Sequence, residues 1–299
     1  MRSKKLRFQE ITPLSEFQFS VACHSICISK DRCKALAAGV YKPTVKLFDF
    51  KSGMMKFERH MVCDPIKVVS LEDDAEKFSI LRSDKAIEFH TKGGFHEKVK
   101  TPNQPKDMVF NTVSSELYLG GNYSEVYRFN LEQGRFLKSI PVAGNKMSWS
   151  DTHGLLGAIS KKSLIFVDTR SKDNIITHTF GSELLSVAQD GSGLKYAIGS
   201  ENGELLEYDF RSSRPLKHLN FNYFIQKIEF SDRKLIAAAN ERIYIIQEDV
   251  SSLEDVIDPG FRINDFSIDG GLIFIGGEDP EIKTLVSEDL GAIPSWAMT

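Results

Sequence analysis

The 299-residue sequence lacks the features that mark membrane-spanning and secreted proteins. No apolar run approaches the ~20 residues that a helix needs to cross a bilayer. Met1–Glu10 contains basic residues without an apolar stretch behind them, which is unlike a secretory signal. Apolar residues nevertheless make up 41% of the chain, which is enough for a sizeable core. These observations predict an intracellular globular protein without a membrane partner.

Cysteine is scarce, and its spacing argues against the common metal sites. The four cysteines are Cys23, Cys27, Cys33 and Cys63, with no C-x-x-C pair and no histidine pair near them. Zinc sites usually draw tetrahedral ligands from two closely spaced pairs. We therefore expect buried thiols that pack as small apolar side chains, and neither a metal nor a cofactor.

Catalytic signatures are also missing from the sequence. It contains no G-x-x-x-x-G-K-S/T phosphate loop, no H-E-x-x-H, no G-x-S-x-G and no G-x-G-x-x-G between a strand and a helix. Gly191-Ser192-Gly193 follows Asp190 and precedes a strand, which indicates a hairpin turn rather than a nucleotide loop. These absences predict a protein that is not an enzyme, with no catalytic residues and no small-molecule substrate. A hydrolase whose catalytic groups converge from distant positions stays an alternative of a different class.

A unit of about 40 residues recurs seven times along the chain. Each unit has a short run of small and aliphatic residues, a turn, an apolar run and often an acidic residue. The equivalent positions within the small-residue runs are Ala37, Ile80, Leu119, Gly157, Ala197, Ala237 and Ile275. Their spacing is close to the ~40–45-residue period of a WD40 blade, in which four strands form one sheet.

The apolar runs after these positions are rich in Val, Ile, Leu, Phe and Tyr and are too short for ordinary helices, so they predict strands. Four strands per unit account for nearly all of the chain, which predicts an all-β fold, a seven-bladed WD40-type β-propeller. We expect a short basic N-terminal extension over residues 1–16 and the propeller over residues 17–299. Glu16–Ser20 alternates like a strand, and we expect it to close the last blade as the outer strand.

Two Asp-x-Arg pairs follow apolar strands, Asp168 with Arg170 and Asp209 with Arg211. In WD40 proteins such an aspartate caps the strand through local hydrogen bonds, and the arginine pairs with it or faces a partner. We interpret both pairs as structural, because propellers host many unrelated functions. Similar pairs occur in substrate receptors of cullin-type ubiquitin ligases, which gives the main alternative function.

Basic residues gather at three places outside the predicted strands. The candidate RNA-binding or partner-binding residues are Arg2, Lys4, Lys5, Arg7, Lys161, Lys162, Arg211 and Arg214. Lys and Arg side chains can neutralise RNA phosphates, although solvated surface charge is the plain alternative. Residues 247–290 contain twelve acidic residues against two basic ones, so the other residues sum to +7 within a net charge of −3. This asymmetry favours different neighbours on different sides of the protein.

Several segments resemble one family in their residue text. They are Ala38-Gly39-Val40-Tyr41-Lys42-Pro43, residues 84–96, residues 124–137, residues 208–216 and the terminal Leu290-Gly291-Ala292-Ile293-Pro294-Ser295-Trp296. In order, from about Phe17 to Trp296, the sequence resembles the nucleolar WD40 family known as essential nuclear protein 2 or nucleolar protein 10.

The resemblance implies a specific function. It implies a non-catalytic scaffold of the small-subunit processome, the nucleolar ribonucleoprotein particle that matures the small-subunit rRNA precursor. The expected partners are other ribosome assembly factors, with pre-rRNA as a further candidate. The expected location is the nucleus, in the nucleolus.

Overall fold

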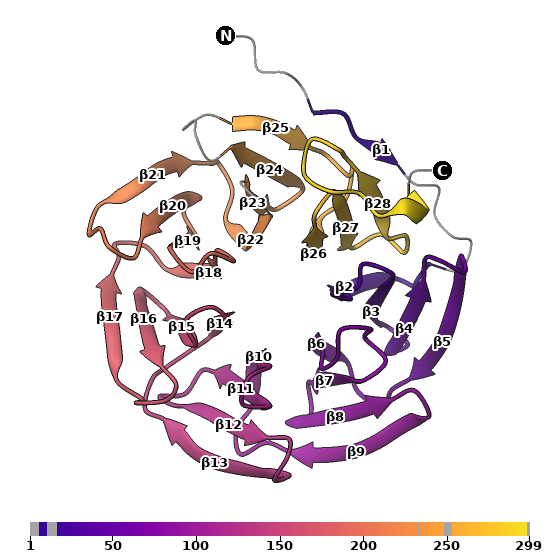
Figure 1. The fold of residues 1–299 in the computed structure, drawn as a ribbon, viewed down its shortest axis with the longest axis horizontal. Helices are drawn as coiled ribbons and strands as arrows, with labels where there is room; N and C mark the ends of the chain where they lie inside the picture. Colours follow the sequence, from indigo (N-terminus) through magenta and orange to yellow (C-terminus); the bar gives the residue numbers. More distant parts are fainter. Residues whose placement is uncertain (1–5, 11–16, 232–233, 248–252, 298–299) are drawn as a thin grey trace. The chain divides into compact units, whose positions relative to one another are not determined.

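The computed structural model of the chain describes residues 6–10, 17–231, 234–247 and 253–297. In these residues the regular structure consists of strands and one short 3-10 turn, Ser295–Ala297. The strands form seven sheets of four, and each printed pairing within them is antiparallel. The all-β, seven-bladed β-propeller predicted from the sequence is therefore confirmed (Figure 1). No helix in these residues is long and apolar enough to cross a membrane.

We number the blades in chain order. Blade 1 contains β2 (Ala22–Ile28), β3 (Lys34–Val40), β4 (Thr44–Asp49) and β5 (Met54–His60); blade 2 contains β6 (Pro65–Ser70), β7 (Phe78–Arg82), β8 (Ala86–Thr91) and β9 (Gly94–Lys100). Blade 3 contains β10 (Pro105–Asn111), β11 (Glu116–Gly121), β12 (Val126–Asn130) and β13 (Arg135–Ile140); blade 4 contains β14 (Lys146–Ser150), β15 (Leu155–Ser160), β16 (Ser163–Asp168) and β17 (Asn174–Thr179).

The remaining blades follow the same pattern. Blade 5 contains β18 (Leu184–Gln189), β19 (Lys195–Ser200), β20 (Glu204–Asp209) and β21 (Pro215–Asn220); blade 6 contains β22 (Ile225–Ser231), β23 (Lys234–Ala239), β24 (Arg242–Gln247) and β25 (Leu253–Ile257). Blade 7 contains β26 (Ile263–Asp269), β27 (Leu272–Gly277), β28 (Lys283–Val286) and, from the N-terminal end of the chain, β1 (Gln9–Glu10).

The repeat found in the sequence coincides with this strand pattern. All seven equivalent positions, from Ala37 to Ile275, lie in the second strand of their blades. The apolar runs that follow them form the third strands. The second strands are almost entirely buried, as in β3 and β27, which explains why small and aliphatic residues recur there.

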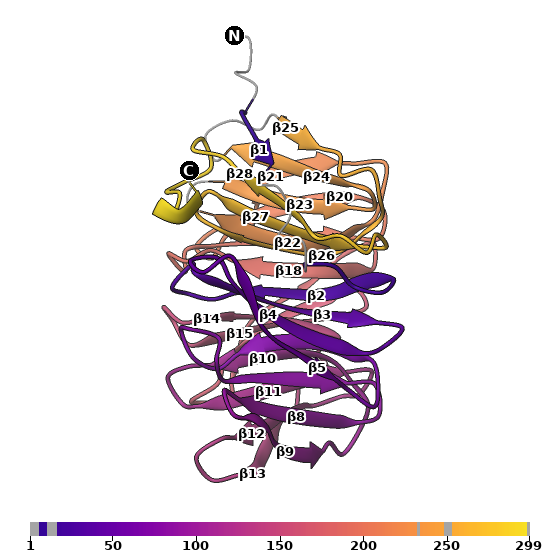
Figure 2. The ribbon, with the colours of Figure 1, turned by 90° about the vertical axis from the view of Figure 1, so that its right-hand side faces the viewer.

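Blade 7 is closed by the N-terminal part of the chain, but not by the residues expected. In β1, Gln9 pairs with Val286 and Glu10 with Leu285, so the outer strand precedes the predicted stretch Glu16–Ser20 (Figures 1 and 2). Within that stretch, Gln18 forms only an isolated bridge with Glu281. A strand of two polar residues shows no alternation of apolar and polar residues, so the sequence pattern could not reveal it. Residues 16–20 do show this alternation, but for another reason.

That reason is the packing of two phenylalanines at the start of blade 1. Phe17 is 1% exposed, and its ring centroid lies 4.0 Å from that of Phe48 and 6.2 Å from that of Phe274. Phe19 covers Gly39 so closely that a Cβ there would lie 2.1 Å from the Phe19 ring. The alternating apolar residues therefore join the buried cores of blades 7 and 1 rather than the edge of a sheet.

The chain divides into two compact units. One comprises Met1–Pro102, Glu241–Ile246 and Leu253–Thr299, and the other comprises Asn103–Asn240 and Gln247–Ser252. The expected division into an extension over 1–16 and a propeller over 17–299 stays a prediction, although β1 lies on the extension side of that boundary.

Candidate functional site

The two Asp-x-Arg pairs have nearly the same geometry in blades 4 and 5. Asp168 Oδ1 accepts hydrogen bonds from the backbone N–H of Arg170 at 2.9 Å and from its Nε at 3.1 Å. Asp209 Oδ1 accepts the same bonds from Arg211 at 2.8 and 2.9 Å. The hydrogen bond from Arg211 is the main cause that lowers the pKa of Asp209, to about 2. Each aspartate thus holds its turn, while both guanidinium groups remain largely exposed.

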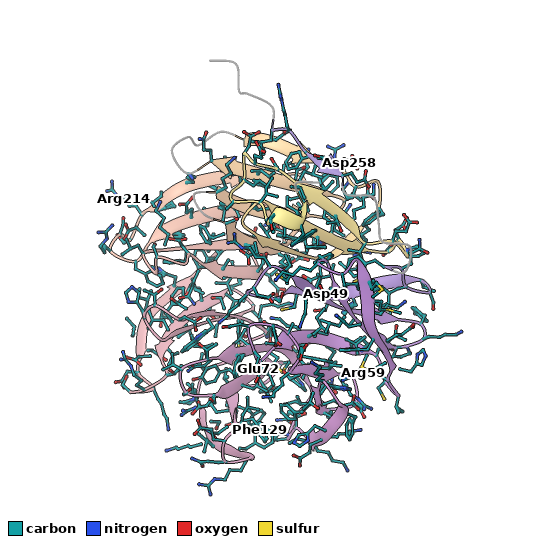
Figure 3. All side chains as sticks on the ribbon, turned by 45° about the vertical axis from the view of Figure 1, so that its right-hand side comes forward. Asp49, Arg59, Glu72, Phe129, Arg214 and Asp258 are labelled. Atoms are coloured by element: carbon teal, nitrogen blue, oxygen red, sulfur yellow. The ribbon has the colours of Figure 1, made fainter. Side chains whose placement is uncertain are left out.

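The candidate basic residues of blades 4 and 5 lie at opposite blade ends. In an antiparallel meander the first and third turns share one end and the second turn lies at the other. Lys161 and Lys162 form the second turn of blade 4, whereas Arg211 and Arg214 lie in the third turn of blade 5. All four side chains are exposed, and Arg214 projects from the outside of its blade (Figure 3). The structure therefore separates these residues into two surfaces.

We call the end with the first and third turns the first-turn end. In blades 4 and 5 these ends lie side by side, because Thr152 Oγ1 donates a 2.8 Å hydrogen bond to Gly191 O. This contact brings the turns that contain Arg170 and Arg211 to the same side of the second unit. The Lys161-Lys162 turn instead accepts backbone hydrogen bonds from Phe180 and Leu184, where the chain leaves blade 4 for blade 5.

Only one member of the N-terminal basic cluster can be placed. Arg7 is exposed, and its backbone N–H donates a 3.2 Å hydrogen bond to Asp289 Oδ2. Arg2, Lys4 and Lys5 lie outside the described residues. A role for this cluster in binding RNA or a partner stays a prediction.

Blade 2 contains a buried charged cluster that the sequence reasoning missed. Arg82 is 2% exposed and forms an ion pair with Glu88, and its Nη2 lies 2.7 Å from Asp84 Oδ2. His90 Nε2 lies 3.3 Å from Glu88 Oε2, and Arg59 Nη1 lies 3.3 Å from His90 Nδ1. Because arginine only donates, Nδ1 is the acceptor and Nε2 carries the hydrogen.

Burial and the neighbouring charged groups shift the pKa of Glu88 in opposite directions. Burial raises the pKa of its carboxyl, but the hydrogen bond from His90 and the charge of Arg82 more than offset this effect. The pKa of Glu88 therefore lies below its usual value, and the carboxylate stays charged at neutral pH. The Phe78 ring stacks on that of His90, with the ring centroids 5.0 Å apart.

Blade 5 contains a second buried glutamate, which borders a cavity of about 470 Å³. Glu207 is 2% exposed, and Lys217 Nζ lies 2.9 Å from its Oε2. This contact is an ion pair without hydrogen-bond alignment, because Oε2 has no hydrogen-bond partner among the described residues. Lys217 Nζ instead donates a 2.9 Å hydrogen bond to Gln247 O. Lys195 Nζ is more distant, at 3.8 Å from Glu207 Oε1.

One sequence signal could have pointed to both glutamates. Each is a charged residue inside a third strand that is otherwise largely apolar, in Ala-Ile-Glu-Phe-His-Thr and Glu-Leu-Leu-Glu-Tyr-Asp. Charges are rarely buried without partners, so an acid at such a position predicts a buried cation nearby. The partners themselves depend on strand register, which the sequence did not reveal.

The described residues contain no group of three or more His, Cys, Asp or Glu side chains arranged to hold a metal ion. The four cysteines, all within the described part of the chain, form no disulfide there, and Cys23 and Cys33 are buried. Burial raises the pKa of the Cys23 thiol far above its ordinary value. The charged sites described above offer ion pairs and hydrogen bonds to a partner molecule.

Comparisons with known proteins extend over nearly the whole chain. The chain is 30% identical to the ribosome biogenesis protein ENP2 of Saccharomyces cerevisiae over 308 residues, 95% of this chain and 43% of that protein. It is 31% identical to nucleolar protein 10 of Danio rerio, over 96% of this chain and 43% of that protein. For nucleolar protein 10 of Homo sapiens the identity is 30%, over 96% of this chain and 45% of that protein.

The chain thus spans less than half the length of these relatives. A family model described as "Nucleolar protein 10-like, N-terminal domain", a β-propeller, matches residues 1–299. The match agrees with the seven blades and with the family resemblance of the sequence segments. The chain belongs to the nucleolar protein 10-like family, to whose N-terminal β-propeller domain it corresponds.

Proposed function

We propose that the chain is a non-catalytic scaffold in ribosome biogenesis, within the nucleolar particle that processes the pre-rRNA of the small subunit. The observation that carries this proposal is the family match over residues 1–299, which includes every blade. Relatives that align with 95% or more of this chain include a protein named for ribosome biogenesis and a protein named for the nucleolus. The proposed partners are other ribosome assembly factors, with pre-rRNA as a further partner.

The placement of charge supports a scaffold with several separate contacts. In the second unit, Lys161 and Lys162 lie at the opposite blade end from Arg211 and Arg214, so two partners could be held without competing. We propose these residues, together with Arg7 and the preceding Arg2, Lys4 and Lys5, as contacts for RNA or protein partners. Asp168 and Asp209 would then act by holding Arg170 and Arg211 in place.

Affinity purification of the tagged chain tests the proposal. We expect ribosome assembly factors and the small-subunit rRNA precursor to be recovered, as measured by mass spectrometry and RNA sequencing. Depletion of the protein should make that precursor accumulate, and re-expression should reverse the effect. Recovery of cullin subunits without assembly factors would favour a ubiquitin-ligase receptor and contradict the proposal.

A further inference from the structure

The outer strand of blade 4 has an open edge. β17 pairs with β16 on its inner side, and no strand of the described residues pairs with its other side (Figure 1). An unpaired edge presents a row of backbone N–H and C=O groups to any chain that can pair with it. Natural proteins protect such edges with charged side chains, especially lysine, or with proline. The composition of an outer strand therefore indicates whether its edge is protected.

β17 lacks this protection. Its sequence, Asn-Ile-Ile-Thr-His-Thr, contains no Asp, Glu, Lys, Arg or Pro, and Ile and Thr are strong strand formers. Each of the other outer strands in the described part of the chain contains at least one charged residue. These charged residues include Glu10, Glu58, Lys98, Lys138, Lys217 and Asp255. Blade 4 thus has the edge best suited to pairing with a further strand.

The register shows which backbone groups face this edge. The backbone N–H of Phe180 donates a 2.8 Å hydrogen bond to Lys162 O, directly after the last pair of the β16–β17 ladder. Along an antiparallel pair, residues alternate between bonding to the partner strand and facing away from it. Thr179 and Thr177, one and three residues before Phe180, therefore direct their N–H and C=O groups to the open edge. Both threonines are exposed.

The two faces of β17 differ in chemistry. Ile176 packs against a core cluster shared by blades 4 and 5, and the ring centroid of His178 lies 5.9 Å from that of Tyr208. Successive side chains alternate between the faces of a strand, so Thr177 and Thr179 project from the opposite face. An added strand would continue both faces, with apolar side chains beside Ile176 and His178 and small or β-branched ones beside the threonines. A charged side chain on the first of these faces would lose hydration beside an apolar core.

The length of the edge favours a flexible segment over a second copy of the chain. Six residues in a strand span about 20 Å. Two folded proteins in a stable complex bury about 800 Å² on each partner, which is more than one short edge offers to a rigid second copy. An extended segment needs only the row of backbone bonds and the contacts of alternate side chains.

We propose that β17 binds an extended, uncharged segment of a partner protein, which adds a fifth strand to the sheet of blade 4. The segment exchanges backbone hydrogen bonds with Thr177 and Thr179 and places apolar side chains beside Ile176 and His178. The inference goes beyond the proposed function and does not depend on it, because it follows from one strand and its register.

A labelled peptide, Val-Thr-Val-Thr-Val-Thr with a lysine at each end for solubility, tests the proposal with the 299-residue chain. We expect saturable binding in fluorescence anisotropy. Thr177→Pro removes an N–H that faces the open edge and leaves the hydrogen bonds to β16 in place, so affinity should fall at least about tenfold. A peptide with glutamate in place of the middle valine should bind at least about fivefold more weakly, since its charge would be desolvated.

Blade 5 offers a matched control for the proline variant. The backbone N–H of Phe221 bonds to Gly203 O, as that of Phe180 bonds to Lys162 O, so His218 in β21 occupies the position equivalent to Thr177. His218→Pro makes the same change at the edge of a strand that contains a lysine and should alter affinity less than about twofold. Thr177→Val keeps the N–H and the branched shape, so its affinity should also stay within about twofold of wild type.

Hydrogen exchange gives a measurement that needs no variant. NMR of the chain labelled at threonine nitrogen should show the amides of Thr177 and Thr179 exchanging at least about tenfold more slowly with saturating peptide, because both become hydrogen-bonded. If Thr177→Pro does not fold, this result on the wild type still decides.

Three results would overturn the proposal. They are the absence of saturable binding, full affinity in a folded Thr177→Pro variant, and peptide binding that leaves the exchange of Thr177 and Thr179 unchanged. Sedimentation of the chain alone should show a monomer. A dimer that Thr177→Pro dissociates would assign the edge to a second copy instead.

Discussion

Blades 2 and 5 carry a buried glutamate at the same structural position, but its surroundings differ: in blade 5 it borders a cavity, and in blade 2 it lies in a cluster of ion pairs. Glu88 pairs with Ile80 and Glu207 pairs with Ala197, and these partners occupy equivalent positions in the repeat. Both glutamates also pair with a lysine of the fourth strand, Lys98 or Lys217. The difference therefore arises from the other residues on that face.

The residues of the second strands explain why the surroundings of the two glutamates differ. On the face that bears the glutamate, β7 presents Phe78, Ile80 and Arg82, whereas β19 presents Lys195, Ala197 and Gly199. In blade 2 the arginine compensates the carboxylate and the phenylalanine stacks on His90, which closes the site.

In blade 5 the position equivalent to Arg82 has no room for a side chain. A Cβ on Gly199 would lie 2.6 Å from Ile225 Cγ2. Compensation of Glu207 therefore comes from Lys217 in the fourth strand, while the position equivalent to Phe78 holds a flexible lysine. The same buried acid thus belongs to a closed structural cluster in one blade and to an open polar pocket in the other.

The largest effect on stability is expected when Arg82 of blade 2 is replaced. Arg82→Met should lower the free energy of unfolding by about 3–5 kcal/mol, because it leaves Glu88 buried without its main counter-ion. Chemical denaturation followed by tryptophan fluorescence measures the change. The double variant Arg82→Met, Glu88→Leu removes both charges and should recover most of the loss. A loss below about 1 kcal/mol in the single variant would contradict a closed cluster.

The sequence predicted the repeat much better than it predicted these sites. The small-residue run marks the second strand because that strand is buried in each blade, and this property is local. The outer strand Gln9–Glu10 could not be predicted, since two polar residues form no strand pattern and their partners in β28 lie near the other end of the sequence. Placing the charged residues requires still more structural information. Lys161 and Arg211 can be assigned to opposite ends of their blades only when it is known which turn of the blade each one occupies.

A smaller effect is expected from the glutamate of the open pocket. Glu207→Gln should cost about 1–2 kcal/mol of unfolding free energy, less than Glu88→Gln, because Lys217 retains its hydrogen bond to Gln247 O and borders a cavity roomy enough for water. Parallel denaturation curves of the two variants compare the blades directly. Equal losses of unfolding free energy in the two variants would mean that the cavity does not reduce the cost of leaving Lys217 without a counter-ion. The two blades would then not differ in this respect.

The pH dependence of stability should reveal the closed cluster. The folded-state pKa of Glu88 lies below its unfolded value of ~4.3, so its stabilising contribution is fully present above that value and is lost as the pH falls through the folded pKa. Between pH 5 and 3 the unfolding free energy of wild type should fall more steeply than that of Glu88→Gln, by at most ~1.4 kcal/mol per pH unit. Identical slopes would show that the carboxylate is not held in its charged form.

The smallest change in stability is expected when the blade 5 position equivalent to Phe78 of blade 2 is changed to phenylalanine. Lys195→Phe puts the counterpart of Phe78 at the rim of the pocket, where it gains apolar contact but removes one cation from the surroundings of Glu207. These effects oppose each other, so the unfolding free energy should stay within about 1 kcal/mol of wild type. Chemical denaturation of the variant and of wild type, followed in parallel, measures the difference. A loss of more than about 2 kcal/mol would show that Lys195 is an essential counter-ion of Glu207 rather than a residue at the edge of the cavity.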